Sequence, residues 1–467
     1  MSSMVELLDR KHTTLMLAVV FFATFMDGLD GSIVNVALPD IGSGFGVDTS
    51  TVSWVAITYM MVLAGTLVAF AKVATDLGVK KVMIGGLAIF TVGSFICGIS
   101  TSFIMLIAAR AIQAVGAAMM AATGPMCCVR HLPPTKLAFG LSIVTIGASV
   151  GFAMGPAIGG AIVEFVSWHW IFLINIPLGL ITIPLMIKAI PAGTEEKKPL
   201  RLDCAGTVLL LVSIMLITFA IETLSHSDMR TYSILAAVFG VVLLALFVFV
   251  EKRAEDPLLE LSLFRRWDFV SIFACLMMIN MVFMGIMYLI PFFGEICLDL
   301  SSFVIGLFLL VSAMVTAIFG MPMAKLSDRT GRKPICVLAG VLAAISFSMY
   351  IFFSENMPLL LLFFCMVTMG LSWACVGGPM ASRLVEHAGD QSAMASSLTN
   401  EAYYVGGAIG TALVAMIFTL SSGTDGVNIN ELTETAFLNG YVATAIVVTA
   451  ISILIAVLSF IVKDKKV

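Results

Sequence analysis

Four ionisable side chains lie deep inside long apolar stretches of the sequence: Asp27, Asp30, Arg110 and Glu401. A charge at the centre of a lipid bilayer costs at least about 2.5–3.5 kcal/mol, so such residues are expected to face the protein interior and to be functional. Asp27 and Asp30 are three positions apart, which places them on one face of a helix. These residues could carry protons or bind a cation, and a structural ion pair is the alternative.

Asp30 and Arg110 are expected at a similar depth, measured from the same membrane face, so an ion pair between them is geometrically possible. Burial favours the neutral carboxyl group, whereas a nearby arginine favours the carboxylate. A carboxyl group balanced between these effects can load and release a proton. We predict this role for Asp30, and we predict that Asp27 is a second proton site, a cation contact or a carboxyl group that simply stays protonated.

Glu401 is followed closely by two aromatic residues, Tyr403 and Tyr404. A buried carboxylate beside tyrosine rings would suit an organic cation through charge attraction and cation–π contact. We therefore predict a substrate-binding role for these three residues. Three other acidic residues lie near span ends and are expected to be solvated boundary charges: Glu164, Glu222 and Glu295.

The composition is that of a multi-pass membrane protein. Hydrophobic residues make up 60% of the 467 residues and charged residues 12%, and the mean hydropathy is +1.08. A helix needs about 20 apolar residues to cross a bilayer. Fourteen runs meet this condition, at 15–37, 52–71, 82–100, 103–127, 138–163, 170–190, 205–222, 231–251, 268–293, 304–322, 335–354, 357–380, 395–420 and 438–462.

The basic residues predict the orientation. If the N-terminus is cytoplasmic, all of the 25 lysines and arginines except Arg110 and Arg230 fall in cytoplasmic tails, loops or span ends. We therefore expect both termini in the cytoplasm and the first run to be an uncleaved span. The few basic residues in the external loops fit the plasma (inner) membrane of a prokaryote.

No cofactor or metal is expected. The nine cysteines show no CxxC spacing, and the five histidines are not paired at ligand spacing. The sequence has no GxxxxGK[ST] segment that would cradle a nucleotide. Nothing indicates an enzyme or a nucleic-acid partner, so an ion gradient is the expected energy source.

A glycine ladder occupies the fifth span, at Gly147, Gly151, Gly155 and Gly159, with Pro156 beside it. Residues four apart share a helix face, so these glycines predict a groove for a neighbouring helix. The proline would bend the span. We expect a packing and hinge surface.

A loop repeat divides the chain. The segment 71–81, AKVATDLGVKK, matches the segment 324–334, AKLSDRTGRKP, in alanine, lysine, glycine and a second lysine. Two related six-span bundles would place these turns after the second span of each bundle. The predicted domains are therefore a first bundle at 1–190, a linker and inserted hairpin at 191–267, and a second bundle at 268–467.

With these motifs the chain resembles the fourteen-span drug:proton antiporter family of the major facilitator superfamily. The resemblance covers nearly the whole length. Besides the ladder and the loop repeat, it rests on LDGSIVNVALPDI at 29–41, LIAARAIQAVGAA at 106–118 and SWHWIFLINIPLG at 167–179. The first loop copy departs from the family pattern, because Thr75 and Val79 replace an aspartate and an arginine.

The resemblance implies an all-α membrane protein with the major facilitator fold: two six-helix bundles plus a two-helix insert, 14 transmembrane helices in all. It implies substrate contacts for Asn35 and Gln113. It also implies a conformational motif formed by the glycine ladder with Pro156 and by Asp328, Arg329, Gly331 and Arg332.

The expected function is proton-coupled export of amphipathic, cationic drugs or metabolites by alternating access, by a protein that works as a monomer. The partners would be the small-molecule substrate, protons and the lipid bilayer. The alternatives are a narrow exporter of one metabolite or antibiotic, an importer, and a non-transporting membrane sensor or scaffold.

Overall fold

The computed structural model describes residues 10–190, 204–226, 228–253, 261–354, 358–388, 392–423, 427 and 431–462. Within these ranges the chain forms helices and no strands, and 14 helices are long and apolar enough to cross a membrane. The predicted fold class and span number are confirmed. Several spans are longer than the runs expected for them: the run at 15–37 extends over Lys11–Phe45, the run at 304–322 over Ser302–Thr330, and the run at 357–380 lies at Leu359–Ala388.

The first bundle contains six spans, and its last span is broken between two short helices. Its helices are α1 (Arg10–Phe45), α2 (Thr49–Leu77), α3 (Val79–Gly98), α4 (Phe103–His131), α5 (Pro134–Phe165), α6 (Trp170–Leu173) and α7 (Asn175–Ala189).

The second bundle also contains six spans and follows a 3₁₀ turn, η1 (Leu263–Arg265). Its fourth span contains a π-helical turn next to Pro379. The elements are α10 (Trp267–Ile296), α11 (Ser302–Thr330), α12 (Arg332–Met349), η2 (Tyr350–Phe352), α13 (Leu359–Ala374), η3 (Val376–Met380), α14 (Ala381–Ala388), α15 (Ser392–Ser422) and α16 (Glu434–Ile461).

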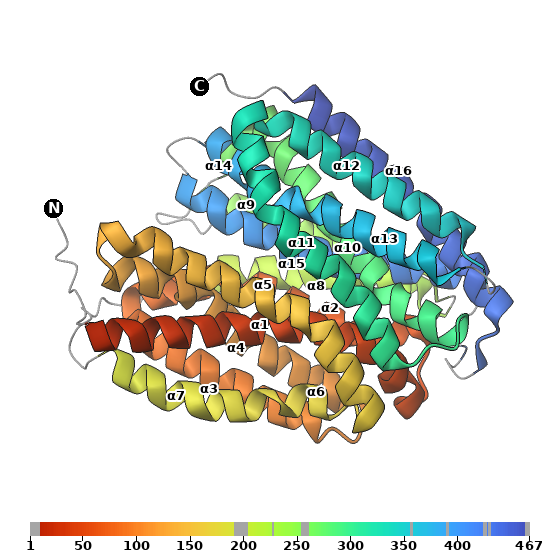
Figure 1. The fold of residues 1–467 in the computed structure, drawn as a ribbon, viewed down its shortest axis with the longest axis horizontal. Helices are drawn as coiled ribbons and strands as arrows, with labels where there is room; N and C mark the ends of the chain where they lie inside the picture. The colour runs from red at the N-terminus through yellow and green to blue at the C-terminus, as the bar shows by residue number, and fades with distance from the viewer. Residues whose placement is uncertain are drawn as a thin grey trace.

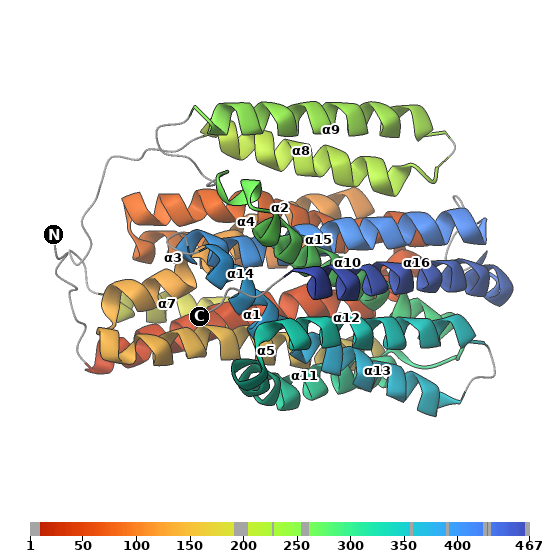
Figure 2. The same ribbon diagram turned by 90° about the horizontal axis from the view of Figure 1, so that it is seen from above.

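The remaining two helices, α8 (Cys204–Thr223) and α9 (Arg230–Glu251), form a hairpin beside the two bundles (Figure 2). The inner helix α8 packs against α2 of the first bundle and α15 of the second. The outer helix α9 exposes apolar side chains, among them Phe239 and Val241, which are about 60% exposed. Such a surface fits contact with lipid. The domain boundaries 190/191 and 267/268 stay predictions, since 191–203 and 254–260 lie outside the described residues.

The two bundles meet mainly through α5 with α11 and through α2 with α15. We call the side on which α1 begins and α16 ends the terminal side. In Figure 1, α5 and α11 converge away from the terminal side and diverge toward it. At the convergence the backbone of Pro156 lies directly against Gly306, and the rings of Phe165 and Phe303 are 5.9 Å apart.

The glycine ladder of α5 packs against α1. A Cβ atom at Gly151 would collide with the backbone carbonyl of Phe25 and lie 2.8 Å from the amide nitrogen of Leu29, and the other three ladder glycines face α1 in the same way. The absence of side chains lets the two backbones approach closely, as small-residue stripes do in membrane helices.

The loop repeat adopts the same backbone conformation in both copies. Gly78 joins α2 to α3 with φ 97°, and Gly331 joins α11 to α12 with φ 90°. Residues with side chains rarely adopt positive φ, so glycine is required at both turns. The two turns occupy equivalent places in the two bundles.

Candidate functional site

Asp30 is fully buried inside the first bundle and all its described partners belong to that bundle. Its Oδ2 atom pairs with the Arg110 guanidinium at 2.6 Å. Its Oδ1 atom accepts hydrogen bonds from the side-chain amides of Gln113 at 2.8 Å and Asn175 at 3.2 Å. The ion pair that the sequence makes possible is therefore present, and two amide groups complete it.

Arg110 is held from three directions. Its Nε atom donates to the backbone carbonyl of Val55 at 3.0 Å, and its Nη1 atom also donates to Gln113 Oε1 at 2.7 Å. The guanidinium carbon lies 4.2 Å from the ring centre of Tyr59. A buried charge held in this way is well compensated, because Nε and Nη1 have oxygen acceptors and an aromatic ring lies against the guanidinium group.

Asp27, one turn along α1, lies between the two bundles. Its Oδ1 atom accepts a hydrogen bond from the Tyr59 hydroxyl at 2.9 Å, and its Oδ2 atom accepts one from the Tyr404 hydroxyl at 3.0 Å. Tyr59 lies on α2 of the first bundle and Tyr404 on α15 of the second. The carboxyl group of Asp27 is therefore a polar contact that joins the bundles.

Tyr59 links the two acidic residues, since its hydroxyl contacts Asp27 and its ring packs on Arg110. We call the series Asp27, Tyr59, Arg110 and Asp30 the central polar chain. The chain is a continuous series of side-chain contacts from Asp27 to Asp30.

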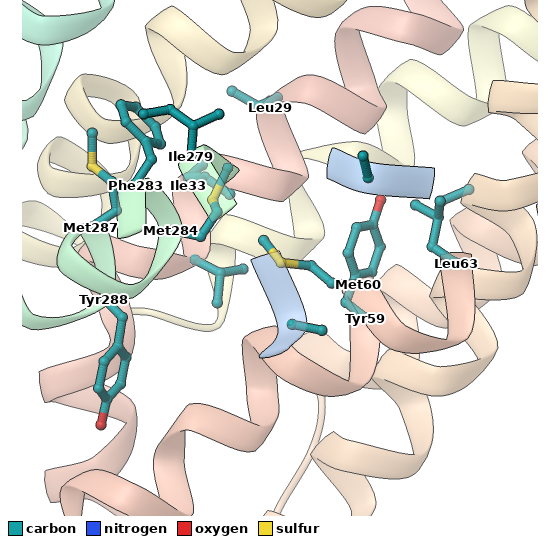
Figure 3. Close-up of a cluster of buried hydrophobic side chains, with 14 of the residues drawn as sticks. Leu29, Ile33, Tyr59, Met60, Leu63, Ile279, Phe283, Met284, Met287 and Tyr288 are labelled. Carbon is teal, nitrogen blue, oxygen red and sulfur yellow. The ribbon is translucent and has the colours of Figure 1, made fainter. Parts of the chain in front are cut away.

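Apolar and aromatic side chains surround this centre. Figure 3 shows a buried cluster in which Leu29 and Ile33 of α1, Met60 of α2 and Met284 and Phe283 of α10 lie together. Phe283 stacks on Trp373 with ring centres 4.0 Å apart, and Trp373 in turn meets Tyr403 edge-on at 6.3 Å. The centre thus combines one carboxyl group with several aromatic faces from both bundles.

Glu401 lines a different space from the one that holds the contacts of Tyr403 and Tyr404. Tyr404 contacts Asp27 and Tyr403 contacts Trp373, whereas Glu401 lines a separate cavity beside the hairpin. On an α-helix, positions 401 and 403 point in nearly opposite directions, which explains the separation. The prediction that these three residues form one cation site stays a prediction, since no contact that joins all three is present among the described residues.

Two further predicted contacts have different outcomes. Gln113 is fully buried and belongs to the Asp30 group, where it also donates to Ser94 Oγ at 2.9 Å. Asn35 is 6% exposed and lies about 12 Å along α1 from Asp27, so it is not part of the central polar chain. The substrate contact implied for Asn35 has no support in this geometry.

Glu222 is not the solvated boundary charge that the sequence suggests. It is 1% exposed, and its carboxylate accepts hydrogen bonds from Ser50 Oγ at 2.6 Å and Trp54 Nε1 at 2.8 Å. These contacts attach the hairpin helix α8 to α2 of the first bundle. The prediction was wrong because the position of Glu222 near a span end does not show which other helix packs beside it.

The second copy of the loop motif forms an ion pair at the terminal side. Arg332 contacts Glu386 of α14 at 2.5 Å and donates to the carbonyl of Ser382 at 2.8 Å, while Asp328 and Arg329 are exposed. In the first copy, where Val79 replaces the arginine, Arg130 of α4 donates to the carbonyl of Thr75 at 3.0 Å. Both turns are thus held by an arginine that contacts a backbone carbonyl.

A family model described as Major Facilitator Superfamily matches residues 20–411. The chain belongs to this superfamily. Its relatives are transporters, so this major facilitator protein is a multi-pass membrane transporter and not an enzyme.

Two relatives of this chain are described as having different functions. The riboflavin transporter RibZ of Clostridioides difficile is 30% identical over 80% of this chain and 81% of its own length. The putative multidrug resistance protein MdtD of Escherichia fergusonii is 32% identical over 68% of each chain. A solved bacterial homologue of the human lysosomal transporter Spinster has a TM-score of 0.68 over 97% of each chain, at 16% identity, which shows the shared fold.

Some residues of this major facilitator site cannot be found from the sequence alone. Tyr59 is one of several polar residues in its span, and nothing in the pattern shows that it meets both Asp27 and Arg110. Asn175 lies within the stretch SWHWIFLINIPLG, and the structure shows that its amide is fully buried and donates to Asp30. A polar side chain inside an apolar span is the feature that both residues share.

Proposed function

We propose that the protein is a proton-coupled antiporter that exports amphipathic, cationic drugs or metabolites by alternating access. The observation that carries this proposal is the position of Asp27, whose carboxyl group contacts Tyr59 of one bundle and Tyr404 of the other. A cation that replaces these hydroxyl partners acts on both bundles at once. We place the protein in the plasma (inner) membrane, as a monomer, with both termini in the cytoplasm.

The central polar chain supplies the coupling. A cation bound at Asp27 competes with the Tyr59 hydroxyl, and the Tyr59 ring rests on the guanidinium that pairs with Asp30. Protonation of Asp30 removes one partner of Arg110, which then turns toward the remaining acceptors. Through Tyr59 and Arg110, proton binding at Asp30 and cation binding at Asp27 therefore lower each other's affinity, as antiport requires.

The arrangement of the bundles supports an inward-facing state. Described contacts between α5 and α11 gather away from the terminal side, and the helices diverge toward it (Figure 1). With cytoplasmic termini, Asp27 is reached from the cytoplasm in this state. Rocking of the bundles about the centre then exposes it to the outside.

The relation to MdtD supports drug efflux, and the relation to RibZ supports a second candidate, a narrow transporter of a flat aromatic metabolite such as riboflavin. The stacked pair Phe283 and Trp373 favours this second candidate, since a planar heterocycle could stack in place of one ring of the pair. A neutral heterocycle has no need of the Asp27 charge.

Transport in proteoliposomes with an acidic lumen separates the two candidates. We expect radiolabelled tetraphenylphosphonium to accumulate as the lumen becomes alkaline, and nigericin, which collapses the proton gradient, to abolish accumulation. Uptake of riboflavin but not of the cation would replace efflux of cations by metabolite transport. Cation uptake that ignores nigericin would contradict proton coupling.

A further inference from the structure

A cavity of about 790 Å³ lies outside the central site, between the hairpin and the second bundle. The hairpin helices α8 and α9 form one wall, and α10 and α15 form the other. Apolar side chains such as Ile217, Phe247 and Phe273 make up most of its lining. Its volume falls in the usual range for small-molecule sites, about 300–1,000 Å³. We call this space the hairpin cavity.

Glu401 gives the hairpin cavity its chemistry. The residue is 6% exposed and lines the cavity, and its Oε1 atom has no hydrogen-bond partner among the described residues. Leaving a carboxyl oxygen buried without a partner is costly. The acidic side chain therefore points to a ligand that brings either a positive charge or a hydrogen-bond donor.

The other charged groups that line the cavity are Lys252, just after α9, and Arg265, at the end of η1. Both lie at the terminal-side end, whereas Glu401 lies about 13 Å along α15 from Ser392. The positive rim and the deeper carboxyl group are thus separate features. An apolar body carrying a cation fits the deeper part.

The hairpin cavity also joins parts that move separately. Glu222 and the contact of Leu211 with Gly65 attach α8 to the first bundle, while α10 and α15 belong to the second. Because α8 also packs against α15, rocking of the bundles must change the packing of the hairpin on at least one bundle. A ligand in the cavity would be sensitive to the state of the transporter.

We propose that the hairpin cavity is a second binding site for an amphipathic organic cation, with the Glu401 carboxylate as its counter-ion. The proposal rests on the function proposed above, because it takes the same substrate class. A cation would then bind beside the hairpin, either before it binds at Asp27 or independently of Asp27. It also gives the hairpin a role, as one wall of a binding site.

Binding stoichiometry tests the site without transport. Radiolabelled tetraphenylphosphonium is equilibrated by dialysis with the full chain in lipid nanodiscs. We expect two molecules bound per native chain and one per chain for both Glu401→Gln and Val405→Phe, which fills the cavity one turn away. Glu164→Gln, which removes an exposed carboxylate outside both sites, should keep two.

Unchanged stoichiometry in Glu401→Gln would overturn the proposal. A second result would also overturn it. If Lys252→Ala and Arg265→Ala lose the second bound molecule, phosphatidylglycerol displaces it from the native chain, and Glu401→Gln has no effect, the cavity is a lipid site. A failure of the proposed function looks different. In that case Glu401→Gln still loses one bound cation, but no proton-driven uptake occurs.

Discussion

The central polar chain contains two carboxyl groups that are only one helical turn apart but have different surroundings. Asp30 is enclosed by Arg110, Gln113 and Asn175, and Asp27 faces the second bundle through Tyr404. Enclosure suits a group that exchanges a proton, and a position between bundles suits a group that meets substrate. Tyr59 is the connection, since it contacts Asp27 and Arg110.

Tyr59→Phe removes the hydroxyl that contacts Asp27 and keeps the ring on Arg110. A hydrogen bond to a charged group contributes about 1.5–3 kcal/mol, so we expect proton-driven cation uptake to fall about tenfold or more. Tyr404→Phe is the matched control, because it removes the other hydroxyl but has no contact with Arg110. We expect it to strengthen cation binding, because the cation no longer has to displace this hydroxyl from Asp27, while the number of protons released per cation stays unchanged. Equal loss of coupling in both variants would contradict the role of Tyr59.

For single residues, the sequence predicts the depth of a side chain in the membrane but not which other side chains it contacts. Asp30 and Arg110 could be placed at equal depth because each span has a countable length. Tyr59 and Asn175 could not be paired with them, because the lateral order of helices is set by packing between distant segments. The same limitation explains the error at Glu222, whose partners lie on α2, and it hides from the sequence the cavity beside the hairpin that Glu401 lines.

Among the helices, the contact of α1 with α5 depends most clearly on single residues. The glycine ladder predicted such a groove, and the structure identifies α1 as the partner. Its role in the conformational change remains a proposal. The periodicity could be read because residues four apart share a face, whereas the partner helix had to come from the fold.

Gly151→Ala should destabilise the first bundle, because the added Cβ atom would meet backbone atoms of Phe25 and Leu29. Overpacking of this kind costs about 1–3 kcal/mol. Gly31→Ala on α1 is the control, since nothing lies within 4 Å of its added Cβ atom. We expect a lower melting temperature in nanodiscs for the first variant only. Equal melting temperatures for the two variants would contradict this expectation, because α1 and α5 would then accommodate the added Cβ atom without loss of stability.

For the transporter as a complete molecule, the two bundles are held together in different ways at different depths. Away from the terminal side α5 and α11 are in direct backbone contact, and in the middle Asp27 and Tyr404 meet. Closure at one end and divergence at the other is what alternating access requires of each end state. The loop-repeat turns at Gly78 and Gly331 lie at the terminal side, where the bundles move apart.

Locking the convergence should stop transport. Phe165→Cys with Phe303→Cys places two thiols where the rings are 5.9 Å apart, and a short bis-methanethiosulfonate reagent should link them. The native cysteines among the described residues, Cys204 aside, are buried, and no disulfide joins them. We expect the linked double variant to lose uptake and to recover it after reduction, with each single variant unaffected. Full transport by the linked protein would show that these helices need not separate.

The central claim is that the Asp27–Asp30 chain couples protons to substrate. The most direct measurement follows tetraphenylphosphonium uptake and lumenal pH in the same acid-loaded proteoliposomes, for the native protein, Asp30→Asn and Asp27→Asn. We predict coupled cation uptake and proton release for the native protein. Asp30→Asn should bind the cation but lose both gradient-driven fluxes, and Asp27→Asn should bind it more weakly. Proton-driven accumulation at the native level by Asp30→Asn would contradict the account.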